Sequence, residues 1–248
     1  MNNFLPYDYK SIIPSDLTSK TILMIGRGSD KLKRFDLGIE SMQYIVKEVP
    51  KCEMVVISKL TGVTYLQKLI KKLNLKNHIK FVGYNSNPEI FFKNASLHIF
   101  PSIAEAFPNV LSETLIYGIP NILVGLDYVS NAKGGTVIIY DDSALSIAKI
   151  AITILLNEKL RKKLGKDARK NIKKFRNDIL FNKWVKLIIS IYKGHNYYED
   201  LRKKDKKITK KEAITIIENQ LNLLKVRIKK FQNITINDIE NFTYMENL

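Results

Sequence analysis

The chain of 248 residues carries 41 Lys and Arg against 24 Asp and Glu, which gives a formal net charge of +17. Its hydrophobic content of 45% excludes a disordered chain and is enough for one sizeable domain or two modest ones. No apolar run reaches the roughly 18 residues of a membrane span, residues 1–15 lack the order of a secretory signal, and Cys52 is the single cysteine. We therefore expect a protein of a reducing compartment, the cytoplasm, without an internal disulfide.

Strand-like and helix-like segments alternate from residue 21 onwards. Compact apolar runs predict strands at 21–25, 53–58, 79–83, 96–100, 121–125 and 135–140. Apolar residues at helical spacing predict helices at 34–49, 64–74, 88–94, 108–117, 144–157, 158–175 and 177–194. Pro108 suits the first turn of its helix, and Asp141, Asp142 and Ser143 are candidates to cap the helix that follows them.

This alternation predicts an α/β fold, with a single Rossmann-like, doubly wound parallel sheet covered by helices on both faces. Ligands of such sheets bind beyond the carboxyl ends of the strands. The candidate loops are therefore residues 26–34, 83–88, 101–113 and 125–135.

Several common kinds of site are absent from these loops. The stretch GRGSDK at 26–31 begins like a dinucleotide fingerprint, but Lys31 stands where the third glycine is needed, and no Gly-Lys-Ser/Thr of a P-loop is present. No cluster of acids and histidines has metal-ligand spacing, so we expect no metal and no bound cofactor. No serine has the context of a hydrolase nucleophile. We expect His78, His98 and His195 to be structural or exposed.

The loop after the first strand is rich in cations that could hold a diphosphate. Arg27, Lys31, Lys33 and Arg34 fall within this loop and the first helical turn, and a guanidinium can bind phosphate with two hydrogen bonds. The helix that begins near Pro108 would bring its N–H groups and positive dipole end to the same edge of the sheet. The alternative is that these cations are solvated loop charges.

The excess of positive charge is concentrated near residue 165. Residues 158–193 carry 13 basic and 3 acidic side chains, whereas residues 1–157 carry 17 and 13. Apolar residues recur every fourth position from Leu160 to Ile172, which predicts a helix with lysines over its other faces. This surface is either a solvated face or a contact for anionic headgroups at the cytoplasmic membrane face or for phosphorylated substrates. Aromatic residues are not interleaved with the charges, so we expect no nucleic-acid partner.

Four motifs follow one another along the chain: IGRGSDKLKRFDLGIESM, IKFVGY, IFPSIAEAFPNVLSETLIYGIPNI and KGGTVII. Together they resemble the donor-binding half of the retaining GT-B glycosyltransferases of family 4, the group 1 glycosyltransferases. In the third motif Glu105 and Glu113 are separated by seven residues and followed by Gly-x-Pro. The resemblance covers about residues 20–193. It divides the chain into a linker-like segment (1–19), a nucleotide-sugar domain (20–194) and a basic linker with a helical extension (195–248).

The resemblance also implies a role for each matching residue. Arg27 and Lys33 would hold the diphosphate of a UDP- or GDP-linked sugar, and Glu105 would orient the hydroxyls of the transferred sugar. Glu113 would accept hydrogen bonds from the two ribose hydroxyls. The catalytic assignments are thus Glu105, Arg27 and Lys33, and the further donor-binding residues are Gly83, Tyr84, Phe107, Asn109, Val110 and Glu113. Ala106 and Pro108 stand where the family often has glycine, and Pro108 removes one amide donor.

The implied reaction is metal-independent transfer of a hexosyl unit to a glycan or lipid-linked acceptor with the anomeric configuration kept. GT-B enzymes have a second, amino-terminal domain that binds the acceptor, and residues 1–15 of this sequence resemble the connection that would follow such a domain. Three explanations stay open: a fragment, half of a split enzyme with a partner chain, or a nucleotide-sugar-binding relic without turnover. The alternative to an enzyme is therefore a non-catalytic nucleotide-sugar-binding or interaction module on the same fold.

The last quarter of the chain is less informative. Residues 177–194 are apolar on most faces, so we expect them to be buried, or to leave an exposed apolar patch around Trp184 if the acceptor domain is absent. Residues 212–231 predict a helix whose stripe runs from Ile214 to Ile228. That helix would either dock on the domain or pair with a coiled-coil partner.

Overall fold

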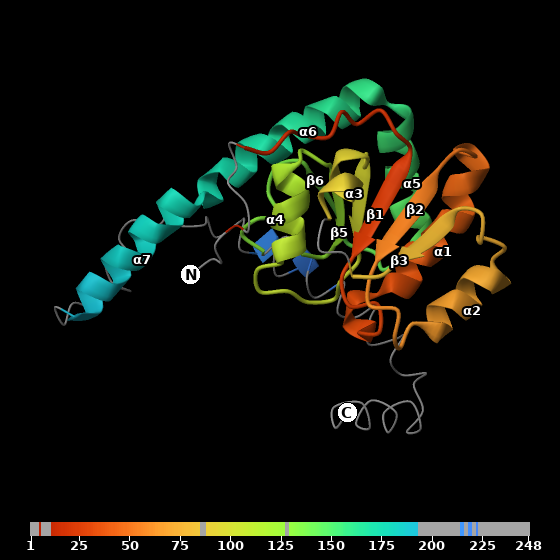
Figure 1. The fold of residues 1–248 in the computed structure, drawn as a ribbon, viewed down its shortest axis with the longest axis horizontal. Helices are drawn as coiled ribbons and strands as arrows, with labels where there is room; N and C mark the ends of the chain where they lie inside the picture. The colour runs from red at the N-terminus through yellow and green to blue at the C-terminus, as the bar shows by residue number, and fades with distance from the viewer. Residues whose placement is uncertain are drawn as a thin grey trace.

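The computed structural model describes residues 5, 11–84, 88–126 and 129–192, and also 214, 215, 218, 219 and 222. In these residues a parallel sheet of six strands has the order β3-β2-β1-β4-β5-β6 (Figure 1). The strands are β1 (Thr21–Ile25), β2 (Glu53–Ile57), β3 (Ile79–Val82), β4 (Leu97–Phe100), β5 (Asn121–Val124) and β6 (Thr136–Ile139). The predicted single doubly wound sheet is confirmed.

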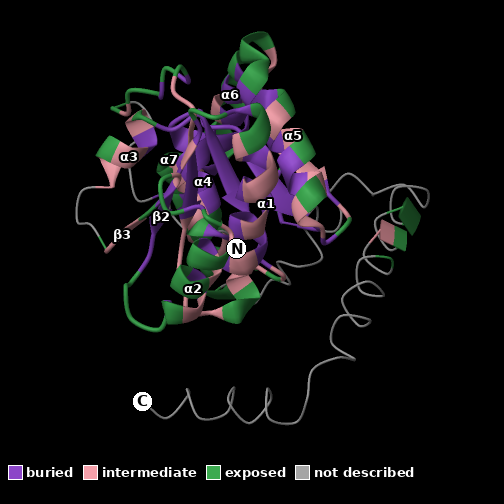
Figure 2. Ribbon diagram, turned by 90° about the vertical axis from the view of Figure 1, so that its right-hand side faces the viewer, coloured by how far each residue is buried: buried purple, intermediate pink, exposed green. Residues whose placement is uncertain are grey.

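Helices cover both faces of the sheet (Figure 2). One face carries α1 (Phe35–Glu48), α2 (Thr64–Lys72) and α5 (Ala144–Leu156), and the other carries α3 (Glu89–Lys93), α4 (Asn109–Ile116) and α6 (Glu158–Ile172). The remaining described elements are the 3-10 turns η1 (Lys31–Lys33) and η2 (Lys173–Phe175) and the helix α7 (Asn177–Tyr192). Every strand and helix predicted up to residue 192 is present, and η1 is an addition.

The apolar runs of the strands follow from burial on both faces. In β1, Ile22 and Met24 pack with the helices of one face and Leu23 with those of the other, and all three are fully buried. A strand with no solvated face has no polar alternation, and its sequence is a continuous apolar run. Two cores therefore lie on either side of one sheet.

His98 on β4 belongs to this interior. Its Nδ1 lies 2.6 Å from Oδ1 of Asn121, which also accepts a hydrogen bond from Thr114 at 2.8 Å. Burial lowers the pKa of His98 to about 4, so the ring is neutral at physiological pH and Nδ1 carries the donated hydrogen. His78 lies near the surface with Nδ1 3.0 Å from the carbonyl oxygen of Cys52, and His195 lies outside the described residues.

The helix starts differ in detail from the prediction. Pro108 is the N-cap residue of α4, one position before the first turn. Ser143 is the N-cap residue of α5, but its side chain makes no capping hydrogen bond. Asp141 instead accepts a hydrogen bond from Ser146, and Asp142 pairs with Arg34 at 2.7 Å.

The prediction that residues 177–194 are buried is wrong for the described residues. Helix α7 projects from the domain (Figure 1), and Leu180 is its one buried residue. The side chain of Asn177 fixes its start, because it accepts from the N–H of Leu5 at 2.7 Å and donates to the carbonyl of Leu5 at 3.0 Å. The exposed apolar side chains are Phe181, Trp184, Ile188, Ile189, Ile191 and Tyr192. The alternative prediction, an exposed apolar patch around Trp184, therefore describes α7.

Most of the carboxyl-terminal extension lies outside the described residues, so the predicted helix at 212–231 stays a prediction. Ile214 is helical and 44% exposed. No helix in the described part of the chain has the length and apolar character to cross a membrane.

Candidate functional site

The candidate site lies at the carboxyl edge of the sheet between β1 and β4. These two strands are neighbours, and the strand order reverses between them. The loops that follow such a pair diverge to opposite faces and leave a crevice where ligands bind in open α/β sheets. Here the two loops are tied together, because the N–H of Ile103 donates to the carbonyl oxygen of Leu32 at 2.8 Å.

Two residues that follow β2 in the chain, Ser58 and Tyr65, hold the loop after β1 in place. The N–H of Gly28 donates to Oγ of Ser58 at 2.8 Å, and the hydroxyl of Tyr65 donates to the carbonyl of Gly28 at 3.0 Å. A Cβ at Gly28 would lie 2.9 Å from Oγ of Ser58 and 3.1 Å from Val63, so only glycine fits this turn without a shift. Ser58 and Tyr65 were not predicted to support the site, because they belong to no recognisable motif.

Arg27 presents its guanidinium to solvent from this fixed loop. Its side chain is 75% exposed, and Nη2 lies 3.1 Å from Oδ2 of Asp30. The other carboxylate oxygen of Asp30 accepts from the N–H of Leu32 at 3.0 Å and caps η1. Arg27 is therefore positioned at the rim of the crevice, where an anion can reach it.

Lys33 and Glu105 form an ion pair that bridges the two loops. The pair is largely covered, because the side chain of Lys33 is 20% exposed and that of Glu105 is 14% exposed. The hydroxyl of Ser102 also donates to Oε1 of Glu105, at 2.9 Å. Lys33 and Glu105 were predicted to bind different parts of the donor, and in the structure they contact each other directly.

The start of α4 faces the same edge. The first N–H groups of an α-helix have no carbonyl partner inside the helix, and the dipole of the helix makes this end positive. The turn is braced by Asn131, whose Nδ2 lies 3.1 Å from the carbonyl oxygen of Pro108 and 2.7 Å from Oγ of Ser112. Asn131 is fully buried, and the sequence analysis placed it in a candidate loop without a role.

Glu113 lies one turn into α4 and differs from Glu105 in its surroundings. The side chain is half-buried, and burial raises the pKa of its carboxyl group above the ordinary value. No described residue gives this carboxylate an ion pair or a hydrogen-bond donor. A half-buried carboxylate without a protein donor is suited to accept hydrogen bonds from a ligand.

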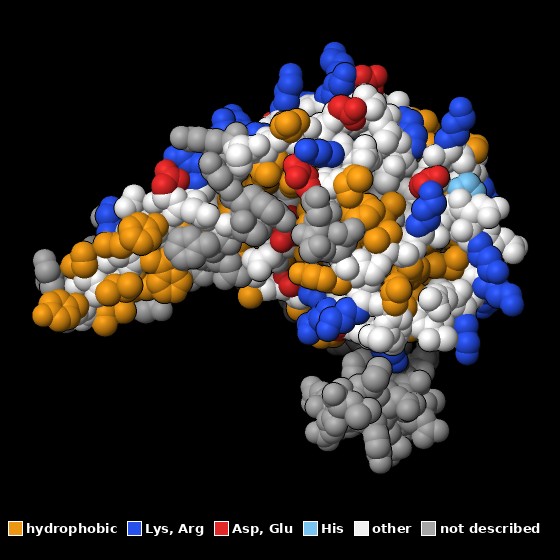
Figure 3. Space-filling model, viewed as in Figure 1, with side chains coloured by type: hydrophobic (Ala, Val, Ile, Leu, Met, Phe, Trp, Pro, Cys, Tyr) orange, Lys and Arg blue, Asp and Glu red, His pale blue; other side chains and the backbone are white. Residues whose placement is uncertain are grey.

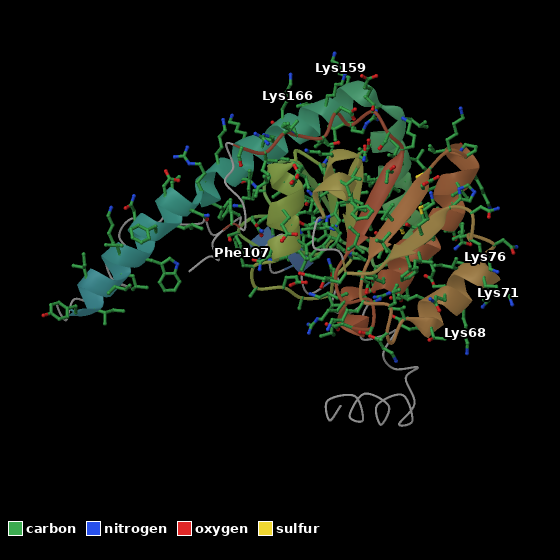
Figure 4. The ribbon with its side chains drawn as sticks, viewed as in Figure 1. Lys68, Lys71, Lys76, Phe107, Lys159 and Lys166 are labelled. Carbon is green, nitrogen blue, oxygen red and sulfur yellow. The ribbon has the colours of Figure 1, made fainter. Side chains whose placement is uncertain are left out.

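The other predicted donor-site residues lie at two places on this edge. Phe107, Asn109 and Val110 belong to the turn before α4 and its first residues, and Phe107 packs on Phe175 with ring centroids 5.6 Å apart (Figure 4). Gly83 and Tyr84 follow β3, two strands away from β1 in the sheet, and Tyr84 is 86% exposed.

Among the described residues, no three His, Cys, Asp or Glu side chains are grouped so that they could hold a metal ion.

Residues 8–171 of the chain match the family "Glycosyl transferases group 1". The chain belongs to this family. Poly(glycerol-phosphate) alpha-glucosyltransferase of Bacillus subtilis is 24% identical over 242 residues, which are 95% of this chain and 32% of that protein. An N-acetylgalactosaminyltransferase of Campylobacter jejuni that acts on a diphospho-undecaprenol acceptor is 28% identical over 165 residues, 64% of this chain and 44% of that protein. The group 1 chain thus spans less than half the length of these curated relatives.

Solved structures agree on the fold. S. aureus TarM, crystallised with UDP, superposes with a TM-score of 0.63 at 22% identity over 75% of this chain and 37% of that one. Anabaena HepE, in complex with UDP and glucose, superposes with a TM-score of 0.60 at 17% identity over 70% of this chain and 48% of that one. The sheet and its helices therefore form one half of a GT-B fold.

Proposed function

We propose that residues 20–194 of this group 1 glycosyltransferase bind a nucleotide-diphospho-sugar, UDP- or GDP-linked, and hold it for retaining transfer of the hexosyl unit. Arg27 and Lys33 bind the diphosphate together with the start of α4, Glu105 orients the sugar, and Glu113 accepts from the ribose hydroxyls. Gly83 and Tyr84 lie beside the base, and Phe107, Asn109 and Val110 approach the sugar and phosphate.

This proposal rests on one observation: a carboxylate without a protein donor and several positive groups lie at the same edge of the sheet. The half-buried carboxylate of Glu113 lacks a described donor, the positive start of α4 lies one helix turn before it, and the loop after β1 brings its cations to the same edge of the sheet. A ligand that fits must combine hydroxyl donors with a nearby anion. A nucleoside diphosphate has both, with the ribose next to the phosphates.

The reaction follows from the same charges. When the bond between the sugar and the diphosphate breaks, negative charge develops on the leaving phosphate, and cationic side chains and N–H groups already in place stabilise it. We propose that no metal ion takes part, because Arg27, Lys33 and the helix start supply this neutralisation. Glu105 and Glu113 hold different parts of the donor and do not act as the acid and base that flank one bond in glycosidases.

We propose further that the acceptor, a glycan or lipid-linked sugar, is bound mainly by a separate domain or partner chain that covers α7. The exposed side chains Phe181, Trp184, Ile188 and Ile191 follow one another at spacings of three and four residues, which makes one apolar stripe (Figure 3). An apolar stripe of this length on a projecting helix is typical of a surface that another chain or domain covers. The relatives are two to three times as long as the matched part, which leaves room for such a domain.

The test is calorimetry of the 248-residue chain with UDP and GDP. We expect micromolar binding of one of them, which corresponds to about 8 kcal/mol. Glu113→Ala and Lys33→Ala should each weaken it by about 10- to 100-fold, since each loses hydrogen bonds to a charged group. Glu48→Ala and Lys51→Ala, both exposed and at the other edge of the sheet, are matched controls that should bind as the wild type does.

The absence of binding by the wild-type protein to either nucleotide would refute the donor site. The isolated chain should transfer little sugar by itself, and vigorous transfer without any added protein would refute the need for an acceptor-binding partner.

A further inference from the structure

A row of lysines on α6 and η2 has no part in the donor site. Between residues 158 and 174, all of which the structure describes, eight side chains are exposed and seven of them are lysines. They are Lys159, Lys162, Lys163, Lys166, Lys170, Lys173 and Lys174, called the lysine ridge below. The eighth is Glu158, which pairs with Lys162 at 2.5 Å.

The ridge is a straight and outward-facing feature. Lys159 and Lys174, at its two ends, are 15 residues apart, which is about 22 Å along a helix. The space-filling view shows Lys and Arg side chains standing out along the upper edge of the molecule (Figure 3), and Lys159 and Lys166 point away from the sheet (Figure 4). The opposite side of α6 is buried through Gly165, Ala168 and Ile172, so packing determines which residues face outward. Packing does not require that they be lysines.

The ridge destabilises the helix that carries it. Like charges four residues apart repel one another on a helix. Such pairs are Lys159 with Lys163, Lys162 with Lys166, Lys166 with Lys170, and Lys170 with Lys174. A surface that only had to be soluble would mix both signs of charge. The ridge is therefore better explained by a partner with negative charge.

The chemistry of the ridge selects the class of partner. Its exposed side chains include no aromatic residue or arginine, the anchors that carry protein–protein interfaces, and lysine is depleted from such interfaces. They include no stacking aromatic and no amide that would read a base edge. Lysine ammonium groups are point charges on flexible stems, which suit a surface of many phosphate groups with no fixed geometry.

A groove beside the ridge also favours an anionic partner. It lies between α6 and residues 14–17 and has a volume of about 640 Å³. Its charged lining consists of five cations and one acid: Lys162, Lys166, Arg169, Lys170, Lys173 and Asp16. This volume is within the range of small-ligand sites and can take a phosphate headgroup. We propose that the lysine ridge docks the protein on the surface of an anionic lipid bilayer.

The placement of α6 leaves the donor site open in this arrangement. The start of α6 lies at the amino edge of the sheet. The ammonium group of Lys20, just before β1, donates to the carbonyl oxygen of Leu155, and Asn157, two residues later, is the N-cap of α6. Its end continues into η2, where Phe175 packs on Phe107 at the donor edge. A bilayer on the ridge would lie along the flank of the domain, and the crevice between β1 and β4 would open beside it.

The experiment measures sedimentation of the full chain with vesicles of pure phosphatidylcholine and of phosphatidylcholine with about one third phosphatidylglycerol. The test variant is Lys163→Glu/Lys166→Glu. Its new charges form three opposite-charge pairs at four-residue spacing, with Lys159, Lys162 and Lys170, against one like-charge pair with Asp167, so the variant gains net attraction within the helix and should fold. The matched control is Lys68→Glu/Lys71→Glu, which makes the same change on exposed residues of α2, at the other end of the molecule (Figure 4).

We expect the wild type to bind the anionic vesicles and not the neutral ones, and to be released at about 0.5 M salt, because exposed charges are then screened. The α6 variant should bind at least about tenfold more weakly, and the α2 variant within about twofold of the wild type. Thermal unfolding of both variants verifies that they are folded.

Three results would overturn the proposal. Equal losses in the two variants would show that net charge alone matters. Binding that persists in high salt would assign it to the apolar stripe of α7. Unchanged vesicle binding by the α6 variant, with lost retention on an immobilised anionic polymer, would assign the ridge to a polymer.

Discussion

Replacement of Glu105 by alanine should change the affinities for a nucleoside diphosphate and for the matching nucleotide sugar in opposite directions. Glu105 pairs with Lys33 and accepts from Ser102 in the crevice between the two loops. A diphosphate that binds Lys33 must compete with this carboxylate. Removal of Glu105 makes the ammonium group available, whereas the sugar loses the carboxylate that would hold its hydroxyls.

The expected sizes follow from the exposure of the pair. Its side chains are 20% and 14% exposed, so solvent still screens the attraction, and we take about 1 kcal/mol for the pair. UDP should therefore bind the Glu105→Ala variant about fivefold more tightly. The sugar loses hydrogen bonds to a charged group, worth about 1.5–3 kcal/mol. The preference for nucleotide sugar over nucleoside diphosphate should fall by about 10- to 100-fold.

Calorimetry with UDP and UDP-sugar on the same preparation measures both numbers, or GDP and GDP-sugar if guanine is preferred. Glu105→Gln is the matched control, because it removes the charge and keeps a hydrogen-bonding group. It should tighten UDP binding to the same extent and lose less of the preference. If the two ligands change by the same factor in Glu105→Ala, Glu105 does not distinguish the sugar and the reasoning fails.

Three further predictions concern acid, burial and pH. His98 should make the fold acid-sensitive, because a histidine in the unfolded chain is protonated below about pH 6.5 and the native ring only near pH 4. Urea unfolding should therefore show a loss of about 3 kcal/mol in the free energy of unfolding between these two pH values. The His98→Gln variant should show little of this loss. On α7, Ile188→Ser should change the free energy of unfolding by less than about 0.5 kcal/mol, since this side chain is 61% exposed, whereas Leu180→Ser, at 2% exposed, should cost about 3 kcal/mol in the same assay. Ligand hydroxyls that donate to Glu113 favour its charged form, so nucleotide affinity should rise with pH through its raised pKa, and calorimetry of Glu113→Gln should show a flatter pH profile.

The fold was predictable because a sheet that is buried on both faces requires recognisable apolar patterns in its strands and helices. Strands such as Thr21–Ile25 are continuous apolar runs, and helices such as Phe35–Glu48 repeat their apolar residues at helical spacing. Helix α7 shows the limit of this reasoning. Its apolar residues predicted burial, but the pattern does not identify what would cover them, and within the described structure nothing packs over them.

The places of the candidate residues in the fold were predictable to the level of loops. The rule for parallel sheets places Arg27 and Glu105 at one edge, because the strands before them are neighbours. The pairing of Lys33 with Glu105 could not be predicted, since it depends on the shapes of two loops 72 residues apart in sequence. The role of Asn131 could not be predicted for the same reason, because its partners are Pro108, the N-cap of α4, and Ser112 within that helix, about 20 residues earlier in the sequence.

The two glutamates of the β4–α4 segment illustrate how surroundings divide tasks between identical groups. Glu105 is neutralised by Lys33, and Glu113 has no donor from the described residues. In the proposed complex a nucleoside would therefore bind Glu113 without breaking a described hydrogen bond or ion pair of that carboxylate, whereas a sugar hydroxyl would bind Glu105 only in competition with Lys33. A diphosphate on Lys33 weakens that competition and makes Glu105 more available. Phosphate and sugar binding should then be coupled, and because coupling between two ligands is reciprocal, UDP should raise the affinity for the free sugar by the factor that the sugar raises it for UDP.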